Sequence, residues 1–330
     1  MRTLLFAVAI AAGWSMQAEA VATHNRLAAN RLAANRLAAN RLAANRLAAN
    51  SLSSTKLSAL AETADILRTN SGRQVYAYLM SCSLDAGTQI TKTGVYDCVD
   101  ANDDGVPDDS DNDGNPDDCS QLADDPAPQN EFDDPAFCNN GTCTFDGLLG
   151  LAPDWANRRL SDTGQGWVSA CMLARINAFA TAEGISMRGP HPALSLTSAE
   201  RGSYTLEEGS FYGNIFARNA IDWNACQGAD QYDWLTGGAP GDGVEDPGDD
   251  TGGSLYTRDC AEPSAANDGT TVCGFNYAGF CGNFASSDYS CKSQNGVDGF
   301  YRDCHESDGP GKWGGQATYR QVITVYVAAP

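Results

Sequence analysis

"GQGWVSACMLARINAFATAEG", residues 164–184, carries the clearest helical pattern in the chain. Its larger side chains recur at helical spacing and would share one side of an α-helix: Val168, Cys171, Met172, Arg175 and Phe179. The stretch predicts a helix, and the fold class depends on what surrounds it.

Two further helices are expected before this one. From Ser54, apolar residues at 57, 60, 61, 64 and 67 are spaced three or four apart and lead to Asn70 and Gly72, which predicts a helix with a C-cap. Ser71-Gly72-Arg73-Gln74 resembles a capping box, which predicts a second short helix through Tyr78 and Cys82.

The later part of the chain is typical of strands. Four short runs rich in β-forming residues are bounded by Gly or Pro: "GISMRG" (184–189), "GSFYGNIFA" (209–217), "TVCGFNYAGFCG" (271–282) and "QVITVYVAA" (321–329). Helices early and short antiparallel strands late predict an α+β fold over residues 55–330.

The N-terminus has the features of an export signal. A basic start, an apolar run from Leu4 to Trp14 and small residues near position 20 predict a secretory signal peptide over residues 1–20. No later run approaches the roughly 18 apolar residues that a membrane helix needs. We expect a secreted product, extracellular or periplasmic, without a membrane span.

Five identical copies of Asn-Arg-Leu-Ala-Ala follow, beginning at Asn25. On a helix, a five-residue period would turn successive leucines about 140° apart, so they would share no face. The repeat resembles the pentapeptide-repeat family, which implies a short β-helical coil. The other interpretation, which we prefer, is a low-complexity stalk over residues 21–54, because so few short repeats bury little surface.

Twelve cysteines lie after these repeats. In an oxidising compartment an even number predicts up to six disulfides, whose pairing the sequence does not determine. Cys138 with Cys143 would close a local loop, and Cys98 with Cys119 would bracket an acidic segment. The absence of C-x-x-C pairs and the small number of histidines disfavour zinc.

The net charge of −21 is concentrated between residues 97 and 135, and no Lys or Arg occurs between Lys92 and Arg158. Such a field repels nucleic acid and anionic lipid surfaces and attracts cations. The segment has almost no apolar side chains, so we expect it to interrupt the domain as an insertion over about 97–135.

Within this insertion, "DANDDGVPDDSDNDGNPDD" (100–118) repeats the spacing of a calcium loop. Calcium takes six to eight oxygen ligands from alternate positions of a loop, with Gly at the sixth place for the sharp turn. Two overlapping frames start at Asp100 and Asp109, with Gly105 and Gly114 in the sixth place. The expected ligands are Asp100, Asn102, Asp104, the Val106 carbonyl, Asp108, Asp109, Asp111, Asp113, the Asn115 carbonyl and Asp117.

The overlap leaves no room for the helices of paired EF-hands. The motif resembles the thrombospondin type 3 repeat, which implies successive calcium ions along a chain supported by disulfides rather than by a core. The alternative is a solvated acidic linker. The regular glycines and the absence of Glu from 100–118 favour calcium. A second acidic tract, 241–250, has Gly238 and Pro240 where ligands would stand and is expected to be a plain loop.

Two catalytic interpretations remain as alternatives. Gln165, Cys171 and the distant His305 follow the order of papain-type cysteine peptidases, which they resemble, although the residues around Cys171 differ from that family's motif. The even cysteine count instead favours Cys171 as a disulfide partner. Glu207 or Glu208 could supply one carboxylate of a glycosidase, although a solvated strand start is the plainer interpretation.

The sequence therefore predicts a secreted or cell-surface, calcium-binding, disulfide-stabilised protein with a binding or structural role, of which adhesion is one form. Calcium ions and an extracellular glycan or protein are the expected partners. The alternative is a secreted hydrolase, either a cysteine peptidase using Cys171 and His305 or a carboxylate glycosidase.

Overall fold

The structure is a computed structural model that describes only part of the chain. The described residues are 23–24, 27–28, 67–99, 108, 110, 118–125, 136–177, 184–217, 223–228, 260–261, 272–273, 275–282, 290–305 and 318–328. The expected signal peptide and nearly all of the stalk lie outside them. No helix within the described part of the chain has both the length and the apolar character needed to cross a membrane.

Helix α6, Asp162–Ala174, is the helix expected from "GQGWVSACMLARINAFATAEG", but it is shorter than the pattern predicts. It begins at an N-cap, Ser161, whose hydroxyl accepts a hydrogen bond from the Gly164 amide at 3.1 Å. It ends at Arg175, because the next residues, β8 (Ile176–Asn177), pair with a parallel strand, β2 (Leu27–Ala28). The expected helix is therefore wrong at Ile176 and Asn177, where pairing with a distant strand outweighs local helical preference. The rest of its second half, 178–183, lies outside the described residues.

Helix α5, Asn70–Ser83, confirms the helix expected through Tyr78 and Cys82 and corrects its start. The N-cap is Thr69, whose hydroxyl accepts from the Gly72 amide at 3.1 Å, and not Ser71. Asn70 therefore opens this helix rather than closing an earlier one. Of the earlier helix expected from Ser54, only the stretch from Leu67 onward is described.

The remaining helical elements are short. They are η1 (Pro153–Ala156), η2 (Pro192–Leu194) and α7 (Ser198–Ser203). Each of the first two has Pro at the start, where the missing backbone N–H costs nothing. Thr197 caps α7 by accepting from the Glu200 amide at 3.1 Å.

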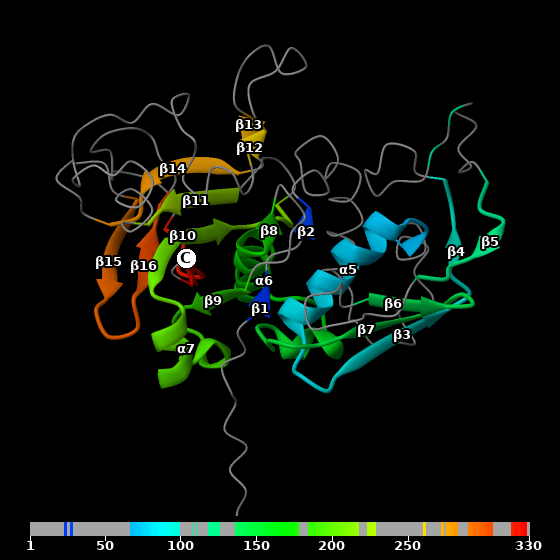
Figure 1. Ribbon diagram of the computed structural model, residues 1–330, viewed down its shortest axis with the longest axis horizontal. Helices are drawn as coiled ribbons and strands as arrows, with labels where there is room; N and C mark the ends of the chain where they lie inside the picture. Colours follow the sequence, from blue (N-terminus) through cyan, green and yellow to red (C-terminus); the bar gives the residue numbers. More distant parts are fainter. Residues whose placement is uncertain are drawn as a thin grey trace, which may run out of the picture.

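A six-stranded sheet forms one side of the molecule, in the order β1-β9-β17-β10-β11-β14 (Figure 1). Its strands are β1 (Thr23–His24), β9 (Gly184–Arg188), β17 (Ile323–Val327), β10 (Leu206–Gly213), β11 (Trp223–Gln227) and β14 (Asn276–Phe280). Neighbours are antiparallel except β11 and β14, which are parallel. The late strands thus form a largely antiparallel sheet, as expected, with one parallel pair.

Smaller sheets complete the described structure. The three-stranded sheet β3-β7-β6 consists of β3 (Gln89–Thr93), β7 (Thr142–Asp146) and β6 (Ala136–Asn139). The two-stranded pairs are β4 (Tyr96–Asp97) with β5 (Gln121–Leu122), β12 (Cys260–Ala261) with β13 (Val272–Cys273), and β15 (Cys291–Asn295) with β16 (Phe300–Cys304). Residues 23–24 and 27–28 pair with β9 and β8, so the start of the expected stalk adds strands to the body.

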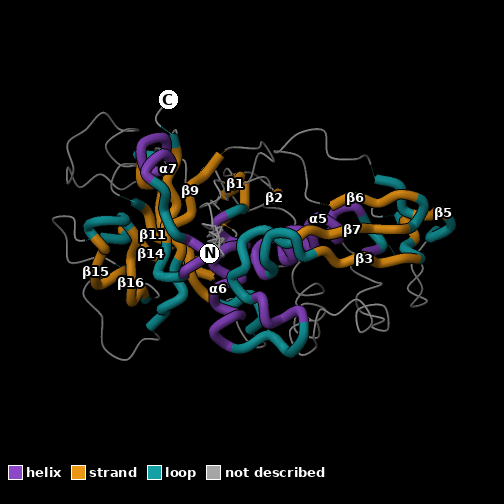
Figure 2. The backbone as a smooth tube through the Cα atoms, turned by 90° about the horizontal axis from the view of Figure 1, so that it is seen from below, coloured by secondary structure: helices purple, strands orange, loops and turns teal. Residues whose placement is uncertain are grey.

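The core lies where α5 and α6 pass between the two larger sheets (Figure 2). Alternate residues of the six-stranded sheet, such as Ile185 and Val325, face α6 and are fully buried with its Val168 and Met172. On the other side of the helices, α5 packs on the three-stranded sheet, where the rings of Tyr76 and Phe145 meet edge to face with centroids 4.7 Å apart.

The opposite face of the six-stranded sheet is buried but polar. The β15–β16 hairpin covers it, and the Tyr301 amide donates to the Thr324 hydroxyl at 3.0 Å. Arg188 lies on this face at 5% exposure, with its guanidinium carbon 3.4 Å from the centroid of the Tyr326 ring. Burial lowers the pKa of Arg188 from its ordinary value, although the charge of Glu200 opposes the shift.

Five disulfides join the described residues: Cys82–Cys171, Cys98–Cys119, Cys138–Cys143, Cys226–Cys281 and Cys291–Cys304. Both of the pairs expected from the sequence are confirmed. Cys82–Cys171 ties α5 to α6 across the core. The two remaining cysteines, Cys260 and Cys273, are directly opposite each other in the β12–β13 backbone register. The result is an α+β, disulfide-rich fold.

Candidate functional site

The two ends of the aspartate-rich segment meet at one place in the structure. β4 precedes the segment and β5 follows it, and the two strands pair, with Tyr96 opposite Leu122. Next to them the Cys98–Cys119 disulfide brings the two Cα atoms to 4.1 Å. Residues 99–118 are therefore the contents of a covalently closed loop, which we call the aspartate loop.

A ring of backbone hydrogen bonds fastens the base of this loop to the β6–β7 hairpin. The Val95 amide donates to the Gly141 carbonyl at 3.0 Å, the Gly141 amide to the Ala123 carbonyl at 2.8 Å, and the Ala123 amide back to the Val95 carbonyl at 3.0 Å. Gly141 is required here, because its φ is +73° and a Cβ would lie 2.7 Å from the Leu122 side chain. The loop thus starts and ends on a rigid support.

Arg73 of α5 pairs with one carboxylate on each flank of the loop. Its side chain is 1% exposed. Nε and Nη2 donate to the two carboxylate oxygens of Asp125, each at 2.7 Å, and Nη1 donates to Asp97 at 2.9 Å. Burial lowers the pKa of Arg73, but the hydrogen bonds and charges of Asp125 and Asp97 together outweigh burial, so the pKa lies above its ordinary value. A permanent positive charge therefore lies between Asp97 and Asp125, at the base of the loop.

Of the ten expected calcium ligands, Asp108 alone falls among the described residues. Its amide donates to the Val99 carbonyl at 2.8 Å, so the segment folds back on its own base. The other nine lie outside the described residues: Asp100, Asn102, Asp104, Val106, Asp109, Asp111, Asp113, Asn115 and Asp117. Within the part of the chain that is described, no three His, Cys, Asp or Glu side chains gather as a metal site.

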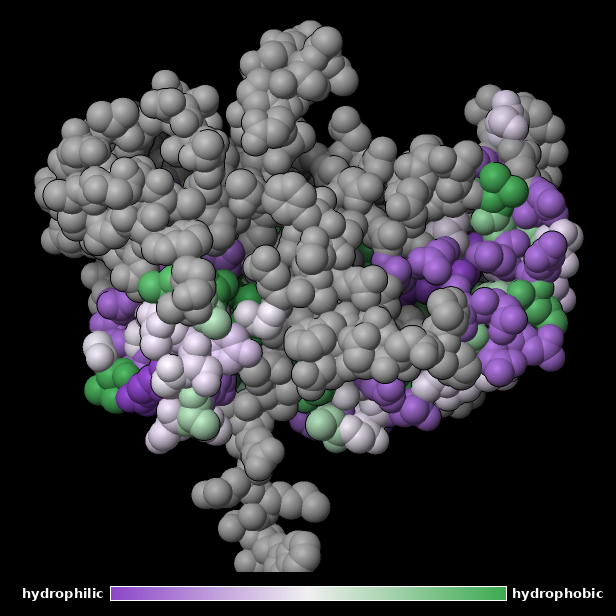
Figure 3. Space-filling view, in the orientation of Figure 1, coloured by the Kyte–Doolittle hydropathy of each residue, from purple (hydrophilic) through white to green (hydrophobic). Residues whose placement is uncertain are grey.

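The surface around the base is mixed in character. Figure 3 shows hydrophobic patches within hydrophilic surroundings in the region of β4 and β5. Val99 and Leu122 flank the disulfide and are 44% and 38% exposed. Chemically, the base can hold a loop closed, but its two anchored carboxylates, Asp97 and Asp125, are already occupied by Arg73.

The structure contradicts the cysteine-peptidase alternative at its nucleophile. Cys171 is fully buried and bonded to Cys82, so it offers no thiolate. Gln165, the expected oxyanion partner, instead accepts a hydrogen bond from Asn214 at 3.2 Å. His305 is 3% exposed, and its backbone carbonyl accepts from the Tyr212 hydroxyl at 2.7 Å. Cys171 and His305 are therefore structural residues of the core.

Glu207 and Glu208 are not at a solvated strand start, and that expectation is wrong. They lie in β10 at 4% and 1% exposure, beside an irregularity in the register with β17. A Glu207 carboxylate oxygen accepts from Gln294 at 2.8 Å and from the Tyr326 hydroxyl at 3.4 Å. Both carboxylates are therefore covered by protein, and Glu207 belongs to the polar layer beneath the β15–β16 hairpin.

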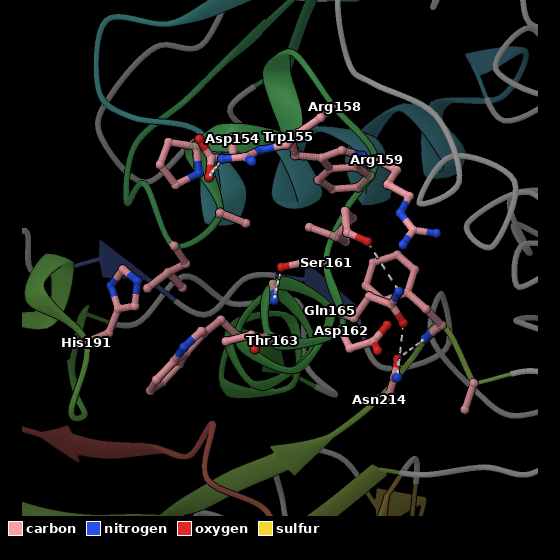
Figure 4. Close-up of a pocket in the computed structure, with 18 residues that line it drawn as sticks. Asp154, Trp155, Arg158, Arg159, Ser161, Asp162, Thr163, Gln165, His191 and Asn214 are labelled. Carbon is pink, nitrogen blue, oxygen red and sulfur yellow. Dashed lines mark hydrogen bonds and ion pairs between the residues drawn. The ribbon is translucent and has the colours of Figure 1, made fainter.

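A second site is a cavity of about 1040 Å³ at the N-terminal end of α6 (Figure 4). η1 and the turn at 158–160 form one wall, the first turn of α6 forms the floor, and His191 and the 214–217 turn close the sides. The His191 Nδ1 accepts from the Ala193 amide at 3.2 Å, which leaves the proton of the neutral ring on Nε2. Burial lowers the pKa of His191, so the ring is neutral at neutral pH.

Sequence reasoning missed both Arg73 and this cavity. Arg73 had a weak signal, because it is the one basic residue in a helical stretch of mostly apolar and small residues, 70–84. The cavity had none, since its lining comes from segments between residues 151 and 217 that only the fold brings together. No family model matches the chain, and no curated protein and no solved structure matches it either.

Proposed function

We propose that the protein is a secreted, calcium-binding protein whose aspartate loop folds around calcium ions and whose disulfide-rich body has a binding role outside the cell. The observation that carries the proposal is the closed base of the loop. Cys98–Cys119, the β4–β5 pair and Arg73 hold the two ends of the acidic segment together. A solvated linker has no need of such a base, because its ends connect separate bodies.

The closed base would help calcium binding in two ways. Ordering a flexible loop costs conformational entropy, and joining its ends in advance removes part of that cost. Arg73 offsets part of the repulsion among the carboxylates by pairing with Asp97 and Asp125, which lie just outside the two calcium frames, and it reduces their combined charge from −2 to −1. The carboxylates within the two frames are then available to bind calcium ions.

The disulfides support a location outside the cytoplasm. Five of them in the described residues are typical of a protein that folds in an oxidising compartment. Extracellular calcium is abundant enough for weak sites, and we expect dissociation constants of about 10⁻⁴ to 10⁻³ M, as in other extracellular modules. Periplasmic and cell-surface locations are both compatible with this proposal.

Calcium titration of the mature protein by calorimetry tests the proposal. The wild type should give a binding heat at millimolar calcium concentrations. Asp104→Ala and Asp113→Ala, one in each frame, should each weaken the binding. Asp249→Ala is the matched control, because it removes an aspartate from the other acidic tract and should leave the titration unchanged. Equal curves for all four proteins would contradict a site in the aspartate loop.

The hydrolase alternatives have less support. The Cys82–Cys171 disulfide removes the peptidase nucleophile, and iodoacetamide applied to the native protein should therefore leave Cys171 unlabelled. Glu207 and Glu208 are too deeply buried to reach a polysaccharide. No described observation favours a catalytic function over a binding one.

A further inference from the structure

The cavity at the start of α6 shares no residue with the aspartate loop, so the two are separate sites. Its volume, about 1040 Å³, is at the upper end of the range of small-molecule sites. Helix α6 with its N-cap, the proline-led 3₁₀ turn η1 and His191, the N-cap of η2, build the walls, so much of the site is formed before any ligand arrives.

Two aromatic pairs line the cavity. Trp167 meets His191 edge to face with ring centroids 5.1 Å apart, and Trp155 meets Phe216 in the same way at 6.0 Å. Figure 4 shows His191 and Trp155 on different sides of the space, with Asn214 on a third. Trp155, Phe216 and Trp167 are only 1%, 3% and 6% exposed, so the two pairs stiffen the walls but leave no open ring face for a ligand.

Two side-chain amides also line the cavity. Gln165 Oε1 accepts from Asn214 Nδ2 at 3.2 Å, and Asn214 Oδ1 accepts from the Phe216 amide at 2.8 Å. These bonds orient both amides, and each NH₂ group carries a second N–H that can donate to a ligand.

The positive and negative charges of the lining sum to zero. Arg158 pairs with Asp154, while Arg159 and Asp162 are exposed and have opposite charges. His191 adds no charge at neutral pH, because burial lowers its pKa. The whole chain carries −21, so an anion would be repelled on approach. A neutral ligand suits this lining better than an anion or a cation.

We infer that the cavity binds a neutral saccharide of about two sugar units. A saccharide of this size fits the volume, and its hydroxyls both donate and accept, which matches a lining of amides, hydroxyls, a guanidinium and a carboxylate. The disulfide-rich body would then bind a saccharide, in addition to the calcium bound by the aspartate loop. Saccharide binding also agrees with a secreted protein, because neutral glycans are exposed outside cells.

The test is a calorimetric titration of the full mature protein with maltose, cellobiose and N,N′-diacetylchitobiose. A disaccharide of galacturonic acid serves as the anionic probe, and a neutral tripeptide, Gly-Leu-Gly, as the non-sugar probe. Binding of at least one neutral disaccharide supports the inference. Binding of the anionic disaccharide or the tripeptide alone would overturn it, as would no binding of any probe at millimolar concentration.

Variants then locate the site. Gln165→Ala and Arg159→Ala should each weaken saccharide binding about tenfold, which corresponds to the loss of about one hydrogen bond to the ligand. Asn157→Ala is the matched control, since Asn157 is exposed on the same segment but does not line the cavity. Unchanged affinity in both lining variants, with melting temperatures equal to wild type, would place the saccharide elsewhere and overturn the inference.

The outcome is separable from that of the calcium proposal. Saccharide binding should persist in the presence of a chelator, and calcium binding should persist in Gln165→Ala and Arg159→Ala. Loss of calcium binding in Asp104→Ala with saccharide binding intact would show two independent sites. Failure of either titration leaves the other interpretable.

Discussion

Arg73 holds Asp125 through two parallel hydrogen bonds, Nε to Oδ2 and Nη2 to Oδ1, both 2.7 Å long. Bidentate pairing of this kind combines charge with a fixed geometry. Because Asp125 follows the aspartate loop and Arg73 belongs to α5, this pair ties the end of the loop to the core of the molecule. The third partner, Asp97, precedes the loop, so one side chain holds both ends.

Replacing Arg73 by alanine should be strongly destabilising. It leaves Asp125, which is mostly buried, without its cation, and removal of one partner of a buried pair costs about 3 kcal/mol or more. Arg201→Ala is the control, because the Arg201–Asp298 pair is exposed and should contribute less than about 1 kcal/mol. Urea unfolding of both variants measures the difference, and equal losses would contradict the special role of Arg73.

Gly141 tests how the base of the loop is supported. Gly141→Ala adds a left-handed penalty of about 1–2 kcal/mol, and the new Cβ must also displace Leu122 or the Val95 carbonyl. Gly94→Ala is matched in backbone conformation, with φ of +71°, but its Cβ would have open space around it. Thermal melts should therefore show the larger loss for Gly141→Ala. Similar losses would mean that backbone strain alone matters at both positions.

Two buried tyrosines should respond in opposite directions to removal of their hydroxyls. The Tyr76 hydroxyl is buried with no hydrogen-bond partner in the described structure, and burial raises its pKa. Tyr76→Phe removes an unsatisfied group and should stabilise the protein by about 1 kcal/mol. Tyr212→Phe removes a 2.7 Å hydrogen bond to the His305 carbonyl and should destabilise it by about 1 kcal/mol. Chemical unfolding gives both values, and a destabilised Tyr76→Phe would show that the hydroxyl has a partner.

The disulfides should differ in their contribution to stability. Cys82 and Cys171 are 89 residues apart, whereas Cys138 and Cys143 are 5 apart. In the chain-entropy model, the longer loop contributes about 2.5 kcal/mol more. The double variants Cys82→Ala with Cys171→Ala, and Cys138→Ala with Cys143→Ala, can be compared by unfolding in guanidinium. A larger loss for the short loop would show that packing, rather than chain entropy, dominates.

The sequence predicted those parts of the fold that local patterns determine. The strands at 184–189 and 321–329 were expected from runs of β-forming residues and are present as β9 and β17. The end of α6 was not predicted, because it depends on the pairing of Ile176 with Leu27, far away in the chain. The same is true of Thr69, which caps α5 although Ser71 offers the more familiar motif.

The candidate site was predictable in part for similar reasons. The Cys98–Cys119 pair could be expected, since both cysteines flank the acidic run. The role of Arg73 could not, because its contacts with Asp97 and Asp125 span 24 and 52 residues. Burial of Glu207 was also beyond local reasoning, because the β15–β16 hairpin that contacts it comes from another part of the chain.

Equilibrium dialysis against millimolar calcium is the most direct measurement of the central claim, because it counts bound ions without relying on heat or stability. We expect about two calcium ions per chain, one for each frame of the aspartate loop, because calcium loops of this spacing hold one ion each. Asp104→Ala and Asp113→Ala should each lower the count. A wild-type protein that takes up no calcium under these conditions would contradict calcium binding by the aspartate loop.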